Sequence, residues 1–455
     1  MKRFRRGGIH PSPSKLTAGV PILDLPVSDS PCRIMLSQHI GKPARPLVKP
    51  GEHVEAGQMI AEADGFVSAP VHSPVSGKVK GIEKTRNPQG LWRDCIVIIP
   101  DPANDEQLAH RGRDPQTHWG KDPENPSGLD FEPYLQEAPE KIIRAIADAG
   151  IVGLGGATFP SRVKLTVPEG READTVVING AECEPFLTCD DALMRAEAGK
   201  IIAGVRLIMR ACGASKGIVG IEANKPEAIE AMKEAAKKSR ANIDIEPMRT
   251  RYPQGSEKQL IQALTGRKVP AGGLPIDARV VVQNVATAFA VYEAVVSGKP
   301  LTSRIVTVTG PEVISGGNFL VPLGTPLREI IDFAGGLPAG TGKVIAGGPM
   351  MGRAVSNLDA PSEKGLGGIL ILPERMSQRP KEVNCIRCGR CVEACPMGLE
   401  PYLLATLSKL GKDEELMAHG IRNCLECGCC SYICPSARPL VDFLKLGKSL
   451  AAPKR

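Results

Sequence analysis

At 455 residues the chain exceeds one ordinary hydrophobic core and predicts three or four domains. Its net charge of +7 is modest, and its basic residues are not grouped with aromatic residues, which make up only 4% of the chain, so nucleic acid is not the expected partner. No run reaches the ~18 to 20 apolar residues of a membrane span. Residues 1–6 are basic, but the polar, proline-rich sequence after them does not fit a signal peptide, so we expect a soluble or peripheral protein on the reducing side of a membrane.

Residues 1–100 are predicted to form β-structure, because short apolar segments alternate with turn signals. The runs 48–58 and 69–79 resemble the hairpins of biotinyl and lipoyl barrel-sandwich domains. Those domains carry a prosthetic group on a lysine at the hairpin tip, whereas the tip here, 69–74, has no lysine. We therefore expect a scaffold rather than a carrier. Residues 101–133 are polar and rich in proline, which predicts a linker or surface loop.

Residues 134–303 alternate between extended and helical patterns, which predicts an α/β domain with a mostly parallel sheet. The expected strands are 175–178, 218–221 and 280–282, and the expected helices are 142–149, 193–211, 226–241, 257–264 and 286–296.

Residues 304–360 combine short strands, glycine pairs and one helix at 325–336, which fits a small β-grasp unit. A second short linker, 373–382, leads to a ferredoxin module at 375–437, and a basic tail follows at 438–455.

The ferredoxin module contains one cysteine motif written twice, with matching cysteines 39 residues apart. Three cysteines at two-residue gaps can surround one cluster, whereas the fourth, which precedes a proline, ligates the other cluster in two-cluster ferredoxins. The spacing therefore predicts two 4Fe-4S clusters that exchange their fourth ligands. One is assigned to Cys385, Cys388, Cys391 and Cys434, and the other to Cys424, Cys427, Cys430 and Cys395.

Structural zinc and disulfides are the alternatives for these cysteines. Zinc sites usually use two separated ligand pairs, and disulfides need an oxidising compartment that nothing else in the sequence indicates. Leucines at helical spacing over 403–410, followed by Gly411, predict a helix between the motifs and thus an α-helical module. Cys183 and Cys429 receive no role.

A glycine-rich run lies at 153–160. It differs from a dinucleotide fingerprint, because Thr158 stands at the third glycine position and because the run follows a predicted helix rather than a strand. Such a loop can still bring backbone N–H groups close to a phosphate. On the residues alone, phosphate binding and a plain tight connection are both open.

An acidic loop, 179–185, follows the strand expected at 175–178. Ligands of open α/β sheets bind at the carboxyl ends of strands. Glu182 and Glu184 could there orient ribose hydroxyls or the amide of a nicotinamide. The alternative is that they cap the helix that starts near Asp190.

These two loops resemble the flavin- and NADH-binding subunit of respiratory complex I, in which a glycine loop holds FMN and an acidic loop lines the flavin and nicotinamide pocket. The similarity continues through 255–258 and 283–287. Together with the start FRRGGIHP at 4–11 and the order of domains, it covers nearly the whole chain. The chain is identified as a member of the family of C subunits of the Rnf (also called Rsx) ion-translocating electron transport complex.

The resemblance implies a multidomain α/β protein with a barrel-sandwich domain, a Rossmann-like flavin domain, a β-grasp (SLBB) unit and a two-cluster ferredoxin module. It implies FMN, NAD(H) and two 4Fe-4S clusters as cofactors, with Glu182 and Glu184 as the catalytic pair. The residues implied to bind flavin or nucleotide are Gly153, Gly155, Gly156, Ala157, Phe159, Lys164, Asn179, Glu184, Gln283, Asn284 and Thr287.

The family further implies an oxidoreductase subunit of a translocase that exchanges electrons with NAD. NADH gives up two electrons as hydride and a 4Fe-4S cluster takes one, so a flavin pocket followed by two clusters converts between them. The implied partners are the other subunits of the complex and ferredoxin. The implied location is peripheral, on the cytoplasmic face of the inner (plasma) membrane, and basic residues at both chain ends fit docking there.

The chain departs from the complex I pattern at Val152 and Leu154, where complex I has arginines, and at Thr158 and Ala181. Phosphate charge then falls more on Lys164 and on backbone dipoles. Two other functions remain open: a soluble flavin and iron-sulfur reductase similar to cobalamin reductases, and a non-catalytic iron-sulfur relay with a degenerate flavin pocket.

Overall fold

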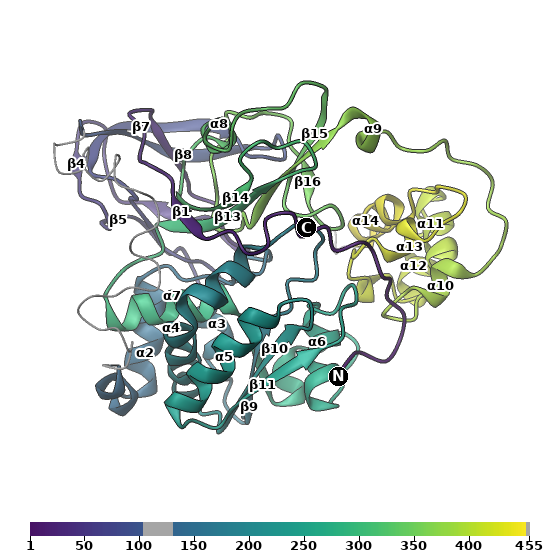
Figure 1. Cartoon of the computed structure of the whole chain (residues 1–455), viewed down its shortest axis with the longest axis horizontal. Helices are drawn as coiled ribbons and strands as arrows, with labels where there is room; N and C mark the ends of the chain where they lie inside the picture. Colours follow the sequence, from purple (N-terminus) through teal and green to yellow (C-terminus); the bar gives the residue numbers. More distant parts are fainter. Residues whose placement is uncertain (103–130, 452–455) are drawn as a thin grey trace.

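The computed structural model describes residues 1–102 and 131–451, and it confirms the predicted fold class (Figure 1). The linker expected at 101–133 lies almost entirely outside these described residues. Within them, no helix is long and apolar enough to cross a membrane.

The barrel sandwich consists of two small sheets that pack around a core of buried aliphatic side chains, among them Ile34, Ile60 and Ile96. Turns and short strands dominate because glycines and prolines interrupt the chain every few residues. One sheet has the order β2-β8-β7-β4 and the other β3-β5-β6. The strands are β2 (Cys32–Met35), β3 (Arg45–Pro46), β4 (His53–Val54), β5 (Met59–Glu62), β6 (Val71–His72), β7 (Gly77–Arg86) and β8 (Trp92–Pro100).

The α/β domain has a fully parallel sheet with the order β11-β10-β9-β12. Both faces of its central strand are buried, since Val176 packs with α4 and α7 while Val177 packs with α6, and such strands are apolar throughout. The strands are β9 (Thr175–Gly180), β10 (Lys216–Glu222), β11 (Ile243–Met248) and β12 (Val280–Asn284). The helices are α2 (Pro139–Asp148), α3 (Ser161–Leu165), α4 (Cys189–Cys212), α5 (Pro226–Ser239), α6 (Glu257–Thr265) and α7 (Val285–Val296), with short 3-10 turns η1 (Glu132–Gln136) and η2 (Pro275–Ala278).

The β-grasp sheet is larger than the range 304–360 that the sequence predicts. Its order is β1-β14-β13-β17-β15-β16, so it takes in β1 (Ile22–Asp24) from the amino terminus and β17 (Gly368–Pro373) from beyond residue 360. Every residue of β17 is buried, so Pro373, where the sequence predicts the start of a linker, still belongs to the sheet. The other elements are β13 (Ser303–Thr309), β14 (Gly317–Pro322), β15 (Thr341–Ala346), β16 (Arg353–Ala354), α8 (Leu327–Phe333) and α9 (Glu374–Ser377).

The ferredoxin module is α-helical, as expected, and it also includes most of the segment predicted as a basic tail at 438–455. Leu440 and Leu444 of α14 (Leu440–Leu450) are buried against α11 (Pro401–Lys409). Their spacing of four residues gives the segment one apolar face, so it folds onto the module. The remaining elements are α10 (Arg390–Glu393), α12 (Asp413–Ala418), η3 (Ile421–Asn423) and α13 (Cys429–Tyr432).

Candidate functional site

The glycine-rich loop joins α2 to α3 and lies against the end of β12. Its base is fastened by the N–H of Leu154, which donates to Thr287 Oγ1 at 2.9 Å, and by the N–H of Gly153, which donates to Phe159 O at 2.8 Å. Gly155, Gly156 and Ala157 are exposed. A Cβ placed on Gly155 would contact Asn284, whereas one on Gly156 would meet nothing within 4 Å. The loop therefore presents backbone to open space beside the carboxyl edge of the sheet.

Apolar residues replace the arginines of the complex I pattern because they belong to the core. Val152 and Leu154 are only 0% and 4% exposed and pack with Ile151 and α7. Positive charge at the loop must come from elsewhere in the fold.

The polar residues predicted at the strand ends do gather beside this loop. Asn284 caps α7 by accepting from the N–H of Ala286 at 2.8 Å, and its Nδ2 donates to Asp190 Oδ2 at 2.7 Å. Asn179 Nδ2 donates to Gly255 O at 2.8 Å, which brings the stretch 255–258 to the same edge. The buried side-chain atoms without a hydrogen-bond partner among the described residues include Gln283 Nε2, Ser161 Oγ and Glu182 Oε2.

Lys164 reaches the same edge from α3. Its Nζ donates to Glu257 Oε1 at 2.7 Å and to Val282 O at 3.2 Å. Both side chains stay partly exposed, so the ammonium group is accessible but shares its charge with a carboxylate.

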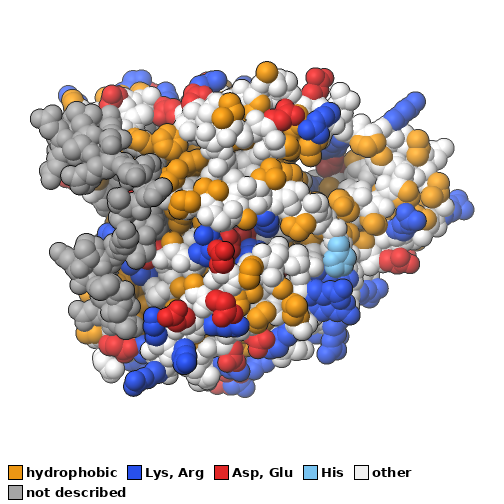
Figure 2. Space-filling model, viewed as in Figure 1, with side chains coloured by type: hydrophobic (Ala, Val, Ile, Leu, Met, Phe, Trp, Pro, Cys, Tyr) orange, Lys and Arg blue, Asp and Glu red, His pale blue; other side chains and the backbone are white. Residues whose placement is uncertain are grey.

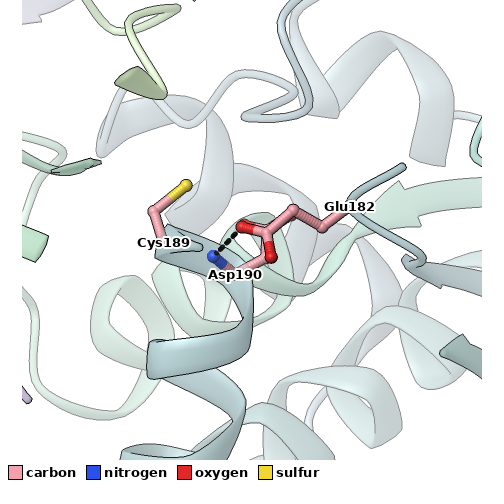
Figure 3. A group of neighbouring side chains, drawn as sticks. All are labelled: Glu182, Cys189 and Asp190. Carbon is pink, nitrogen blue, oxygen red and sulfur yellow. Dashed lines mark hydrogen bonds between the residues drawn. The ribbon is translucent and has the colours of Figure 1, made fainter. Parts of the chain in front are cut away.

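Glu182 caps the amino terminus of α4. Its Oε1 accepts from the N–H of Asp190 at 2.7 Å, and the side chains of Glu182, Cys189 and Asp190 converge within 4.8 Å of one another (Figure 3). Burial raises the pKa of Glu182 to about 7, while Lys15 and Lys225 act to lower it. Because these cations and the helix terminus already stabilise the carboxylates, we interpret the group as a helix cap rather than a metal site.

Glu184 points to the β-grasp unit. Its two carboxylate oxygens accept from the N–H groups of Met350 at 3.1 Å and Met351 at 2.8 Å. Burial raises the pKa of Glu184 to about 7, and these two hydrogen bonds act in the opposite direction. Both predicted acidic residues thus lie at the carboxyl edge, but each already has backbone donors.

The two cysteine motifs have the same local conformation. Arg387 and Glu426, at matching positions, both have φ of +56°, and each donates its N–H to the first cysteine of its motif at 3.4 Å. Gly389 and Gly428 follow with φ of +75° and +78° and start α10 and α13. The repeated spacing therefore encodes one repeated backbone fold.

The fourth cysteine of each motif lies beside the opposite motif. Burial raises the pKa of Cys430, and the neighbouring thiols Cys427, Cys424 and Cys395 raise it further. Burial likewise raises the pKa of Cys391, with a smaller contribution of the same sign from Cys434. We call Cys424, Cys427, Cys430 and Cys395 the inner set, and Cys385, Cys388, Cys391 and Cys434 the outer set.

The inner set faces the α/β domain. Tyr252 Oη donates to Cys427 O at 2.8 Å, and Gln259 Nε2 donates to Pro396 O at 3.3 Å. Cys427 and Cys429 share one buried cluster with Tyr252, and Cys183 of the acidic loop packs against it. Cys385 and Cys388 of the outer set are instead exposed.

Three further residues near the site were not predicted: Lys15, Tyr252 and Lys364. Lys364 is fully buried, and its Nζ donates to Gly150 O at 2.7 Å and to Pro70 O at 3.0 Å, which joins the β-grasp unit, the start of the glycine loop and the barrel-sandwich hairpin. Burial lowers its pKa to about 7. A lone lysine in a glycine-rich segment carries no signal for such a role.

Comparison with known proteins agrees with this organisation. Four family models match in order: the RnfC barrel sandwich hybrid domain over 3–103, the Nuo51 FMN-binding domain over 146–293, the SLBB domain over 305–354 and the 4Fe-4S dicluster domain over 384–437.

Several curated relatives are similar over most of their length. The C subunit of the Na(+)-translocating ferredoxin:NAD(+) oxidoreductase complex of Acetobacterium woodii is 41% identical over 97% of this chain and 96% of its own. The C subunit of the proton-translocating ferredoxin:NAD(+) oxidoreductase complex of Clostridium ljungdahlii is 43% identical over 90% and 85%. Among solved structures, the NAD(+)-reducing NiFe hydrogenase in its H2-reduced state is 20% identical with a TM-score of 0.51, covering 72% of this chain and 65% of that chain, which shows a shared fold alone.

Proposed function

The chain belongs to the family of C subunits of ion-translocating ferredoxin:NAD(+) oxidoreductase complexes, and we propose that it passes electrons between NAD(H), a bound FMN and two 4Fe-4S clusters. The observation that carries the proposal is the attachment of two four-cysteine sets to an FMN-binding fold, with one set packed beside its acidic loop.

The residues at the carboxyl edge fit a flavin with a phosphate. Exposed backbone at Gly155 and Gly156 can approach an anion closely. Ser161 Oγ and Gln283 Nε2, which have no hydrogen-bond partner among the described residues, could each form a hydrogen bond with the bound flavin. Bound there, FMN would supply the conversion between two-electron and one-electron transfer. Lys164 would neutralise the phosphate by sharing its ammonium group between that phosphate and Glu257.

Glu184, with Glu182 beside it, is our candidate for positioning the nicotinamide. Both follow β9 at the carboxyl edge, where a carboxylate can accept hydrogen bonds from an amide or a ribose hydroxyl. On this proposal Glu184 exchanges one backbone donor, from Met350 or Met351, for a donor on the nucleotide. Glu182 keeps α4 capped and so fixes the start of the loop.

Two substitutions test these roles in the anaerobically purified protein. Loss of a charge-assisted hydrogen bond costs about 1.5 to 3 kcal/mol, so Glu184→Gln should slow reduction by NADH by roughly ten- to a hundred-fold while bound flavin and iron stay unchanged. Lys164→Ala should instead lose flavin. If Glu184→Gln reacts with NADH at the wild-type rate, the acidic loop acts only as a cap and an interdomain contact.

The arrangement of the cysteines supports an order for the two clusters. The inner set would receive electrons from the flavin pocket, and the outer set, with Cys385 and Cys388 exposed, would exchange them with a partner. We propose ferredoxin or another subunit of the complex as that partner, and a peripheral place on the cytoplasmic face of the inner membrane. If the chain stays in the membrane fraction after its partner subunits are deleted, it binds lipid itself and the docking proposal fails.

A non-catalytic relay is the second candidate, and one observation favours it: Glu184, Glu182 and Lys164 all have partners within the chain. A soluble reductase would differ by turning over without partner subunits. Measuring flavin, iron and bleaching by NADH separates these functions, because a relay would hold iron but no flavin and would not respond to NADH.

A further inference from the structure

The first residues of the chain form a strap that runs along the α/β domain and the ferredoxin module (Figure 1). We define the strap as residues 2–15. Lys2 forms a bridge with Met248 at the end of β11, and Ile9 pairs in antiparallel fashion with Tyr252. The strap thus crosses the carboxyl edge of the parallel sheet before the chain enters β1. There, with Cys183 and Tyr252, it lines an open pocket of about 240 Å³. Figure 2 shows the same face with its side chains.

The strap contacts the backbone of an inner-set cysteine. The N–H of Gly8 donates to Ala394 O at 2.9 Å. A Cβ placed on Gly7 would lie 2.5 Å from the carbonyl carbon and oxygen of Cys395. Gly7 also has a φ of +67°, so the close approach and the backbone conformation both require glycine.

The same strap holds the acidic loop. Lys15 Nζ donates to three backbone carbonyls, those of Glu182 at 2.8 Å, Glu184 at 3.0 Å and Leu187 at 2.6 Å. Its side chain is only 14% exposed. Three donors of one ammonium group therefore fix the path of the loop that carries both candidate catalytic carboxylates.

The strap is also anchored beside the first of these contacts. Phe4 is 1% exposed, and the guanidinium of Arg251 lies 4.8 Å from its ring centre. Arg251 also donates to Gly7 O. Between the two contacts, Ile9 exchanges backbone hydrogen bonds with Tyr252, and Pro13 O accepts from the N–H of Phe186 at 2.9 Å. The strap is therefore held at several points from Cys395 to the acidic loop.

The covalent connection from the β-grasp unit to the ferredoxin module cannot by itself fix the position of the inner set relative to the acidic loop. It runs through residues 378–389, which have no helix or strand and are all exposed. Other contacts around the inner set involve Tyr252, Met350 and Cys183, and Tyr252 is itself paired to the strap through Ile9.

We propose that the strap is a positioning element that fixes the inner cluster relative to the flavin pocket. This inference rests on the proposed function, in which one electron leaves the reduced flavin and reduces one oxidised cluster at the inner set. The strap takes no part in that chemistry. It sets the separation and orientation of the two sites through Gly7, Gly8 and Lys15.

The test uses the full chain with both cofactors, prepared anaerobically. In Gly7→Ala the added methyl must displace Cys395 or detach the strap. Because the rate of electron transfer falls steeply as two redox sites move apart, stopped-flow measurement should show NADH reducing the flavin at the wild-type rate and the inner cluster being reduced several-fold more slowly. Hydrogen exchange at residues 4–9 should rise, which is independent of turnover, whereas the contacts of Lys15 should keep the acidic loop in place.

Gly19→Ala is the matched control. Gly19 also has a positive φ, +80°, but a Cβ there meets nothing within 4 Å. It should therefore cost backbone strain without changing either rate. A second variant, a deletion of residues 1–8, removes the contact with Cys395 without inserting a clash and should give the same split between the two rates.

Three results would overturn the proposal. The first is a wild-type rate of cluster reduction when hydrogen exchange shows that the strap is detached, and the second is an equal slowing of both steps. The third is a deletion variant with unchanged rates. If NADH fails to reduce any flavin in the wild-type chain, the proposed function fails, and hydrogen exchange in the strap of the Gly7→Ala variant then reports on the strap alone.

Discussion

The two cysteine motifs are nearly identical as sequences and as local backbones, yet their surroundings differ. In the outer set, Cys385 and Cys388 are exposed and Ile386 between them is 66% exposed. In the inner set, Cys427, Cys430 and Cys395 are buried, partly by contacts from the α/β domain. Ligand spacing thus specifies what each motif can bind, whereas tertiary contacts specify which neighbour each cluster can exchange electrons with.

On the electron path proposed above, the order of the two motifs along the chain is not the order of electron transfer. The second motif is the one packed against the acidic loop side of the α/β domain, because Gly428 sits beside Met350 and Cys427 accepts from Tyr252. The module in Figure 1 therefore turns its later motif inward. If the order of the motifs in the sequence were taken as the order of electron transfer, the two clusters would be assigned in reverse.

The largest expected effect is the loss of one cluster through a ligand in the other motif. Cys434→Ala should remove or damage the outer cluster, and Cys395→Ala should do the same to the inner cluster, because each fourth ligand lies beside the opposite motif. Magnetic spectroscopy of the reduced protein would identify the missing signal. If Cys434→Ala affects only the cluster of Cys424, Cys427 and Cys430, the crosswise assignment is wrong.

A second, smaller effect should distinguish the sets by access. The inner site must open locally before a chelator can reach its cluster. Each 1.4 kcal/mol in the free energy of local opening slows iron release by about tenfold. We expect iron to leave the outer set first, by at least that factor, when the anaerobic protein is exposed to chelator. Release at equal rates would show that the interface with the α/β domain opens freely.

Most of the fold was predictable from the sequence, because periodic segments such as 193–211 and the cysteine spacing are local signals. What could not be predicted depends on contacts between distant segments. β17 and β1 join one sheet although they lie far apart in the chain. The segment of α14 was predicted as part of a basic tail, whereas its Leu440 and Leu444 pack against α11.

The candidate site shows the same limit. The polar residues at strand ends were predictable, since strand order brings Asn179 and Asn284 together. The partners that engage Glu184 and Lys164 come from the β-grasp unit and α6, and no periodicity encodes them. Lys15 and Tyr252 donate to backbone carbonyls, and because every residue has a carbonyl, the sequence does not indicate which residues they bind.

A third prediction concerns pH. The carboxyl group of Glu184 has a pKa of about 7 and interacts electrostatically with Cys427. As pH rises through 7 this group ionises, and the added negative charge opposes reduction of the inner cluster. The reduction potential of the inner cluster should therefore fall between about pH 6 and 8, by less than about 59 mV per pH unit, the value for a tenfold change in a one-electron equilibrium.

Glu184→Gln should flatten that dependence, and redox titration with spectroscopic detection would measure it. Glu182 remains in the variant with its own raised pKa, so a residual slope is expected. The outer cluster serves as the internal control. An equal pH dependence of both clusters would mean that the slope comes from bulk charge rather than from Glu184.

The smallest expected effect comes from the hydroxyl of Tyr252. This group donates to the carbonyl of Cys427, and the ring is buried, so Tyr252→Phe keeps the packing and removes one hydrogen bond. Such a bond contributes about 0.5 to 1.5 kcal/mol, and an unpaired buried carbonyl costs about 1 to 3 kcal/mol. We expect faster chelation of the inner cluster by a few-fold with no change at the outer cluster. Tyr432→Phe is the matched control, because Tyr432 lies in the second motif but is 53% exposed. If Tyr252 only fills space, replacing it with phenylalanine should not change iron release. An unchanged rate of iron release from the inner cluster of Tyr252→Phe would therefore show that packing and the strap, rather than the hydrogen bond, hold the second motif against the α/β domain.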